Sequence, residues 1–311
     1  MLINNAIYYA YLWYYYYESV NYGGEPPLPA NGGIMAKTIL DYRAGRPIWC
    51  SYCGNYSLLT ALYMALAELG VEPEGLALVS GIGCSSRMPG FVKGYGFHTV
   101  HGRALPIATG VKEANPALTV VVVSGDGDGL GIGGGHLLHA FRRNADMALM
   151  LVDNGLYGMT KGQPSPTTPY GLATSTTPYG NPDTPLNPVA LALSMGASYV
   201  ARGYTGEIDP LKEILAGAIG HRGFAFVHAI TPCPTFNARE TYKYYSKKVD
   251  RLPDTHDPSD LPSALVLAAD TEMLHTGLFY KAERPTLEDA LQSAREKAGH
   301  AGFTALVERF R

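Results

Sequence analysis

Two apolar runs separated by a glycine-rich turn constrain the fold of this chain most strongly. The runs are Thr119–Ser124 and Met147–Asp153, and both have the length and aliphatic composition of buried parallel strands. Gly125-Asp126-Gly127-Asp128 follows the first run, and Asn154 follows the second. Because the carboxyl ends of parallel strands meet at one edge of a sheet, the side chains of Asp126 and Asn154 are predicted to face one crevice.

Segments with strand and helix character alternate along most of the chain. This alternation predicts an α/β fold with a mostly parallel sheet and helices on both faces. Further strands are predicted at 76–80, 198–201 and 224–230, and helices at 58–69, 104–115, 135–144, 190–195 and 210–220. Residues 155–188 predict a long loop, which inside a compact domain is usually functional. We expect one domain over 35–234 and a tail over 235–311 that packs on the core or on a partner.

The composition of the chain indicates the broad class of protein to which it belongs. The chain has 311 residues, 46% of them hydrophobic and 16% charged, which suits a large multilayer α/β core. The net charge of −3 gives no electrostatic reason to expect nucleic acid or an anionic membrane as a partner. No apolar stretch reaches the ~18–20 residues of a transmembrane helix, so none is expected.

The first 34 residues differ from the rest. Residues 1–34 contain no Lys or Arg and hold eight of the 22 tyrosines. A signal peptide would have a cationic start and an aliphatic core, so this segment is not one. We interpret it as non-native, with translation starting at Met35. The alternative is a real aromatic extension that packs on a partner.

The residues at the two strand ends suit a metal ion that holds a diphosphate. Asp126 and Asn154 offer side-chain oxygens, and the backbone carbonyl of Leu156 is a plausible third ligand for Mg²⁺. The glycines from Gly127 onward let the backbone approach phosphates, and a helix starting near Gly135 would aim its positive end at them. A Gly-Asp-Gly alone also fits a solvent-exposed turn, but Asn154 at the end of the next strand favours the metal site.

Four cysteines form a second cluster of candidate ligands: Cys50, Cys53, Cys84 and Cys233. They are too few for a disulfide framework, so we expect a reduced, cytoplasmic setting. Cys50 and Cys53 have the Cys-x-x-Cys spacing that chelates one metal centre. Cys84 and Cys233 each follow a predicted strand, at the edge that carries Asp126. The residues leave an iron–sulfur cluster, a zinc site and plain buried cysteines open, and one pair with two single cysteines favours the cluster.

With these motifs in place, the chain resembles thiamine diphosphate enzymes, whose signature is Gly-Asp-Gly, some two dozen residues, then Asn. It resembles more narrowly the β subunit of 2-oxoacid:ferredoxin oxidoreductases, from about Met35 to Pro285. The stretches that carry this resemblance are Trp49-Cys50-Ser51-Tyr52-Cys53-Gly54, Gly83-Cys84-Ser85-Ser86, His101-Gly102-Arg103-Ala104, Asp153-Asn154-Gly155-Leu156-Tyr157-Gly158-Met159-Thr160-Lys161-Gly162-Gln163 and Thr231-Pro232-Cys233-Pro234.

The resemblance implies roles for individual residues. The four cysteines would hold a [4Fe–4S] cluster. Arg87 would lie near the 2-oxoacid carboxylate, and Lys161 is a candidate for the distal carboxylate of 2-oxoglutarate. Both could also be ordinary surface cations, and His101 could be a structural loop histidine. Residues expected to contact thiamine diphosphate are Ile82, Gly83, Cys84, Ser85, His101, Gly127, Asp128, Gly158 and Met159.

The resemblance also implies a partner. The chain has room for the diphosphate-binding domain alone, so an α subunit is expected to supply the pyrimidine-binding domain and its activating glutamate, in a heterodimer or a dimer of heterodimers. The predicted activity is coenzyme A-dependent oxidative decarboxylation of a 2-oxoacid, 2-oxoglutarate before pyruvate, with electrons passing to ferredoxin. A non-redox thiamine diphosphate enzyme and a non-catalytic iron–sulfur or zinc module are the alternatives.

Overall fold

The computed structural model describes residues 37–298, so the prediction for residues 1–34 lies outside the described part. Eight of its strands form one sheet in the order β2-β1-β3-β4-β8-β7-β10-β9. Their bounds are β1 Leu76–Ser80, β2 Tyr95–His98, β3 Thr119–Gly125, β4 Met147–Asp153, β7 Tyr199–Tyr204, β8 Phe224–Ile230, β9 Val249–Arg251 and β10 Leu274–Lys281. A separate antiparallel pair joins β5 (Leu156–Tyr157) to β6 (Gln163–Pro164).

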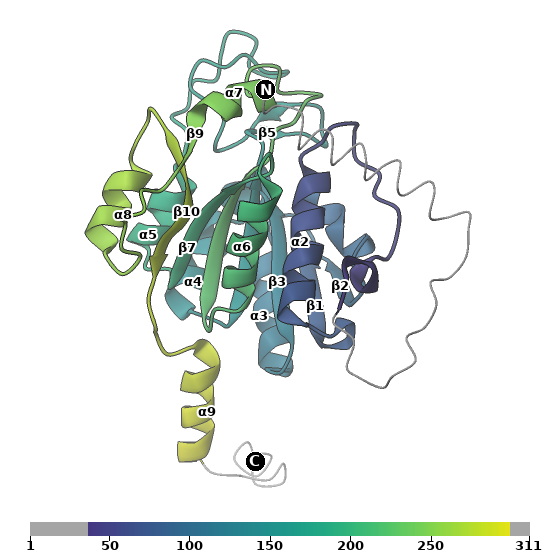
Figure 1. Ribbon diagram of the computed structural model, residues 1–311, viewed down its shortest axis with the longest axis vertical. Coiled ribbons are helices and arrows are strands. Elements are labelled where there is room, and N and C mark those ends of the chain that lie inside the picture. Colours follow the sequence, from purple (N-terminus) through teal and green to yellow (C-terminus); the bar gives the residue numbers. More distant parts are fainter. Residues whose placement is uncertain (1–36, 299–311) are drawn as a thin grey trace, which may run out of the picture.

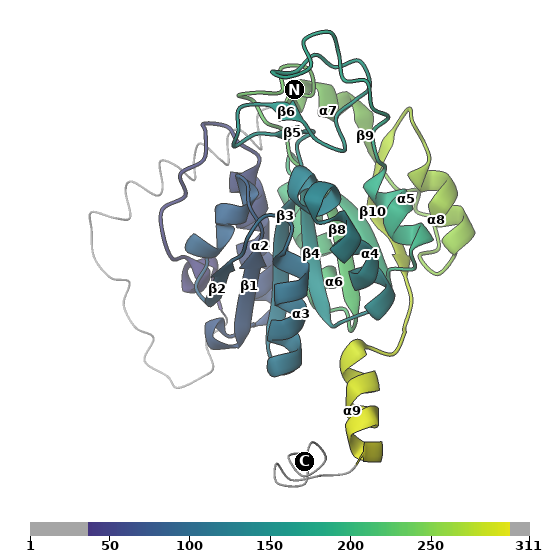
Figure 2. The ribbon, with the colours of Figure 1, turned by 180° about the vertical axis from the view of Figure 1, so that it is seen from behind.

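Helices cover both faces of this sheet (Figures 1 and 2). One face carries α2 (Asn55–Leu69) and α6 (Ile208–Ile219). The other carries α3 (Ala104–Ala114), α4 (Gly134–Arg143), α5 (Pro188–Ser194) and α8 (Leu261–Ala268). In Figure 1, α7 (Tyr242–Lys248) lies above the sheet and α9 (Leu287–Ala298) extends below it. The short helical turns are η1 Ile39–Tyr42, η2 Pro73–Gly75, η3 Ser85–Gly90 and η4 Gly127–Ile132.

The strands β1, β3 and β4 form because each is apolar on both faces. In β3, Val121 and Val123 pack into the core under α2 and α6, whereas Val120 and Val122 pack into the core under α3 and α4. Alternate residues of a strand point to opposite faces, so a continuous apolar run is what a strand covered on both sides requires. The predicted α/β fold with a mostly parallel sheet is confirmed.

All five central strands run in the same direction, so their carboxyl ends meet at one edge. β1, β3, β4, β8 and β7 pair with one another in parallel. The loops that follow them form the upper rim in Figure 1, together with the β5–β6 pair. This rim is the edge at which Asp126, Asn154 and the cysteines were predicted to gather.

The segment predicted as a tail contributes two strands, β9 and β10, to the sheet. β10 pairs antiparallel with β7, placing Gly277 opposite Arg202, and pairs in parallel with β9. α8 packs its buried Ala264 and Ala268 into the core beside α5. Within residues 37–298, no helix has both the length and the apolar character needed to cross a bilayer.

Candidate active site

The Asp128 carboxylate ties three loops together beneath the upper rim. Its Oδ1 accepts hydrogen bonds from the backbone N–H groups of Ile82 at 3.1 Å and Gly102 at 2.7 Å. Its Oδ2 accepts one from the Ser124 hydroxyl at 2.5 Å, and His101 Nδ1 lies 2.8 Å from Oδ1. Asp128 therefore holds the backbone at Ile82 and Gly102 and the Ser124 hydroxyl in fixed positions. A direct contact of Asp128 or His101 with a cofactor stays a prediction.

Two glycines let side chains approach the backbone closely here. A Cβ at Gly81 would lie 1.8 Å from Asp128 Oδ2, and a Cβ at Gly127 would lie 2.4 Å from the Tyr157 ring. The Tyr157 hydroxyl donates a hydrogen bond to the Gly127 carbonyl at 2.9 Å. The turn after β3 is thus held against the segment after β4. Only glycine at position 127 leaves room for the contact with Tyr157.

Replacing Asp128 tests whether it organises the loops. Asp128→Ala is expected to lower the free energy of unfolding by about 2–4 kcal/mol, because buried N–H groups lose their acceptor. Asp128→Asn keeps Oδ1 as an acceptor, so its expected cost is under about 1 kcal/mol. Urea unfolding of both variants measures this difference. If Asp128→Ala leaves stability unchanged and only weakens cofactor binding, Asp128 is a direct cofactor contact and not an organiser.

The carboxyl groups of Asp126, which is buried, and Asp153, which is partly buried, form a pair. The Thr167 hydroxyl lies 2.9 Å from Asp126 Oδ2 and 2.7 Å from Asp153 Oδ1, but it has one proton to donate. Burial, and then the neighbouring Asp153 carboxylate, raise the pKa of Asp126 to about 8. Burial opposes ionisation of Asp153 too, but the interaction with His228 and the hydrogen bonds from Thr167 and Gly155 together outweigh it and lower the pKa of Asp153. The negative charge therefore rests on Asp153, and Asp126 either keeps a proton or binds a cation in its place.

The segment after β4 carries the other predicted metal ligands. Asn154 Oδ1 accepts a hydrogen bond from the Leu156 N–H at 3.1 Å, which folds the segment into a turn beside the carboxyl pair. The Leu156 carbonyl accepts one from the Gly158 N–H at 3.0 Å, and Leu156 itself is buried. Both oxygens keep a second lone pair, so they have the acceptor capacity that a Mg²⁺ ligand needs. Coordination by Asp126, Asn154 and Leu156 stays a prediction.

The four cysteines come from three loops that contact one another. Trp49 Nε1 donates to the Cys84 carbonyl at 2.6 Å, and the Gly54 N–H donates to the Pro232 carbonyl at 3.4 Å. A Cβ at Gly158 would lie 3.6 Å from Cys84 Sγ and 4.0 Å from Cys233 Sγ. The loops that carry Cys50, Cys53, Cys84 and Cys233 therefore meet next to the turn after β4.

The thiols also act on one another electrostatically. Burial raises the pKa of the Cys53 thiol to about 12, and Cys233, Cys84 and Cys50 add to the rise. Burial raises the pKa of Cys84 as well, again with contributions from Cys233 and Cys50. Thiolates packed like this need a positively charged centre between them, and an iron–sulfur cluster or a zinc ion provides one. As placed among residues 37–298, no three His, Cys, Asp or Glu side chains already meet as a metal-binding group.

Two cations lie on the surface of this rim. Arg87 in η3 is exposed, and its charge acts on Cys84. Lys161 is exposed and has a φ of +77°, a left-handed backbone conformation that is uncommon for a residue other than glycine. It lines a cavity of about 300 Å³ together with Phe236 and Arg239.

The remaining predicted contacts also lie around the crevice. Ser85 is buried, and a Cβ at Gly125 would lie 3.7 Å from its hydroxyl, so it sits against the turn after β3. Ile82 and Met159 expose their side chains at the rim. Gly83 has a φ of +140°, which a side chain would disfavour.

Sequence reasoning did not single out Thr167, Asp153 or His228 as site residues. Thr167 lies in the long loop, where nothing in the local pattern marks it. His228 interrupts the otherwise apolar strand Phe224–Ile230, and a titratable residue inside a buried strand was a signal that could have been used.

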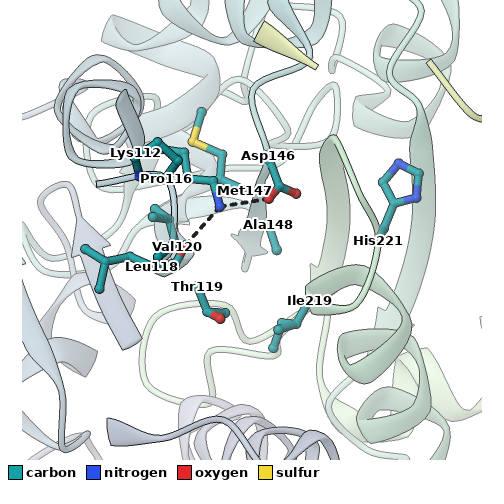
Figure 3. Close-up of a pocket in the computed structure, with 11 residues that line it drawn as sticks. Lys112, Pro116, Leu118, Thr119, Val120, Asp146, Met147, Ala148, Ile219 and His221 are labelled. Atoms are coloured by element: carbon teal, nitrogen blue, oxygen red, sulfur yellow. Dashed lines mark hydrogen bonds and ion pairs between the residues drawn. The ribbon is translucent and has the colours of Figure 1, made fainter. Parts of the chain in front are cut away.

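A second cavity, shown in Figure 3, lies at the opposite edge of the sheet, beside the amino ends of β3 and β4. Its lining includes Lys112, whose ammonium lies 2.7 Å from Asp146 Oδ2 and donates to the Leu118 carbonyl at 2.9 Å. Asp146 also accepts from the Gly223 N–H at 3.1 Å. These charged groups satisfy one another, so they stabilise the fold and leave the upper rim as the candidate site.

Two models of known protein families match this chain. Residues 81–229 match the model of the thiamine pyrophosphate enzyme, C-terminal TPP binding domain. Residues 233–296 match the model of the C-terminal part of the pyruvate ferredoxin oxidoreductase β chain. The fold and rim thus define a thiamine diphosphate-binding domain, and the segment after Cys233 has a family match of its own.

The relatives identify the family. Over 213 residues the chain is 49% identical to the 2-oxoacid:ferredoxin oxidoreductase subunit beta of Saccharolobus solfataricus, covering 68% of this chain and 69% of that one. It is 44% identical over 220 residues to the 2-oxoglutarate oxidoreductase subunit KorB of Mycobacterium tuberculosis, covering 69% and 59%. The solved 2-oxoglutarate:ferredoxin oxidoreductase from Magnetococcus marinus, with 2-oxoglutarate, coenzyme A and succinyl-CoA bound, superposes with a TM-score of 0.85 at 45% identity, covering 88% and 94%.

This chain belongs to the family of 2-oxoacid:ferredoxin oxidoreductase β subunits. It is accordingly an oxidoreductase subunit, and the predicted resemblance is confirmed.

Proposed function

We propose that this chain is the β subunit of a cytoplasmic enzyme that oxidatively decarboxylates 2-oxoglutarate, transfers the acyl group to coenzyme A and passes the electrons to ferredoxin. One observation carries the proposal: the Asp126–Asp153 carboxyl pair and four mutually interacting cysteines gather at the same edge of the sheet. Relatives named as 2-oxoglutarate oxidoreductase and 2-oxoglutarate synthase subunits support the substrate.

The residues of the rim fit the cofactors that this reaction needs. Asp126, Asn154 and the Leu156 carbonyl would hold a Mg²⁺ ion, because a bound cation would allow the buried Asp126 to ionise beside Asp153. The four cysteines would hold a [4Fe–4S] cluster, since their thiolates repel one another without one. When bound, thiamine diphosphate would supply the electron sink for decarboxylation, and the cluster would carry electrons singly to ferredoxin.

The chain's own residues would then hold and orient the reactants. The start of α4, which has no side-chain cap, would offer free N–H groups to the diphosphate. Arg87 would pair with the 2-oxoacid carboxylate next to Cys84, and Lys161 would pair with the distal carboxylate. An α subunit would complete the site with a pyrimidine-binding domain and an activating glutamate.

Lys161 allows a test of the substrate. Lys161→Met is expected to raise KM for 2-oxoglutarate about tenfold to a hundredfold, because a charge-assisted contact to the distal carboxylate is lost. KM for pyruvate, which has no distal carboxylate, should stay unchanged. Steady-state ferredoxin reduction by the αβ complex measures both constants, and Lys297→Met on the remote helix α9 serves as the control. Equal effects on KM for both substrates would refute the contact between Lys161 and the distal carboxylate. If the wild-type enzyme prefers pyruvate, the proposal that 2-oxoglutarate is the substrate is wrong.

A further inference from the structure

A row of buried polar side chains leads from the candidate metal site into the sheet. Arg202 on β7 and His228 on β8 are register partners, and His228 pairs with Leu151 on β4, two residues before Asp153. Arg202, His228 and Asp153 therefore point to the same face. Arg202 and His228 are 2% and 5% exposed. Burying such polar side chains costs free energy of folding, which only close hydrogen-bonded pairing offsets.

The contacts determine which nitrogen of His228 carries its proton. Arg202 Nε donates to His228 Nδ1 at 3.1 Å, and arginine has no acceptor atom, so Nδ1 must offer a lone pair. His228 Nε2 lies 2.8 Å from Asp153 Oδ2 and therefore carries the hydrogen and donates it. His228 is thus a neutral, one-directional link between a guanidinium and a carboxylate.

Asp153 connects His228 to Thr167 and to the turn at Asn154, which lie at the rim. Its Oδ1 accepts from the Gly155 N–H at 3.0 Å and lies 2.7 Å from the Thr167 hydroxyl, which also reaches Asp126. Asp153 is in addition the chain neighbour of Asn154. A rotation of the Asp153 carboxylate would therefore displace both Thr167 and the Asn154 turn.

The far end of the row is anchored in β10. Arg202 Nη1 donates to the His275 carbonyl at 3.2 Å, and the guanidinium carbon lies 5.3 Å from the centre of the Phe279 ring. These contacts hold the guanidinium in one orientation, so it can orient the imidazole in turn.

We propose that Arg202 and His228 are positioning residues for the divalent-cation site: they fix Asp153, which holds Thr167 and the Asn154 turn in register with Asp126. The inference rests on the proposed function, since it assumes a cation at Asp126. Residues that orient metal ligands through hydrogen bonds typically contribute about 10- to 100-fold to metal affinity. We therefore expect a change in Mg²⁺ affinity of that size when His228 is replaced, although His228 would not contact the cation.

Mg²⁺ titration of the αβ complex tests the proposal. The purified complex is stripped of metal, mixed with thiamine diphosphate and titrated with Mg²⁺, and the thiamine diphosphate retained after gel filtration is measured. His228→Phe keeps the ring but loses both nitrogens, and should raise the half-saturating Mg²⁺ concentration about 10- to 100-fold. His228→Gln has an amide oxygen to accept from Arg202 and an amide N–H to donate to Asp153, so it should stay within about threefold of wild type.

Two further variants separate positioning from general destabilisation. Phe226→Leu alters packing two residues before His228 on the same face and should leave Mg²⁺ half-saturation unchanged. Thr167→Val keeps the shape of the half-buried residue that bridges the two carboxyl groups, and should weaken Mg²⁺ binding about tenfold even if His228→Phe fails to fold.

The proposal is overturned if His228→Phe binds Mg²⁺ like wild type, if Phe226→Leu shifts the titration equally, or if glutamine rescues no better than phenylalanine. A wild-type complex that retains thiamine diphosphate without Mg²⁺ would overturn the cation site itself, and the inference with it.

Discussion

Asp126→Ala is expected to abolish retention of Mg²⁺ and thiamine diphosphate, with at least about a hundredfold loss of Mg²⁺ affinity. Mg²⁺ is commonly held by one or two carboxylates together with substrate phosphates, so the loss of Asp126 removes the main anionic ligand. Gel filtration of the variant complex, followed by analysis of bound thiamine diphosphate and magnesium, measures the effect. Asp254→Ala, which changes an exposed aspartate of the C-terminal segment, is the control.

The same substitution should not destabilise the chain when cofactors are absent. Burial raises the pKa of Asp126 above its value in the unfolded chain, to about 8. A group shifted in this direction favours the folded state at low pH and opposes it as the pH rises through the folded pKa. At neutral pH the cofactor-free variant is therefore expected to melt at or above the wild-type temperature, whereas only the wild type should gain stability from Mg²⁺ and thiamine diphosphate. A variant that melts well below wild type and still binds both would contradict this role.

Cys233→Ser should remove the iron–sulfur cluster and with it electron transfer to ferredoxin. Serine supplies no soft thiolate, and the remaining three cysteines lie in the two loops before α2 and after β1. Iron content, visible absorbance and ferredoxin reduction measure the loss, while release of CO₂ from 2-oxoglutarate should persist in part. Pro234→Ala, at the neighbouring exposed position, is the matched control and should retain the cluster. Full ferredoxin reduction by Cys233→Ser would exclude Cys233 as a ligand.

The central strands were predictable because β1, β3 and β4 are continuous apolar runs with polar or glycine residues at their ends, and β8 departs from this pattern only at His228. The strands 76–80, 147–153 and 224–230 have the predicted bounds. β2 was missed and assigned to a loop, because all four of its residues are exposed at the edge of the sheet and lack a burial pattern. β10 was missed as well, because polar His275 and Thr276 and the positive-φ Gly277 interrupt its pattern.

The candidate site was predictable only in part, because sequence position identifies strand ends but not contacts between loops. Asp126, Asn154 and the cysteines stand at strand ends, and parallel topology alone brings such positions to one edge. The bonds of Asp128 to Ile82 and Gly102, and the contacts from Arg202 through His228 to Thr167, depend on loop geometry and strand register. No local spacing encodes those contacts, so they emerge only from the folded chain.

Anaerobic co-purification with the α subunit, followed by iron, sulfide and zinc analysis per β chain, tests whether the four cysteines hold an iron–sulfur cluster. About four irons and about four sulfides, with negligible zinc, are expected. One zinc without sulfide would remove the electron path and contradict the proposed reaction.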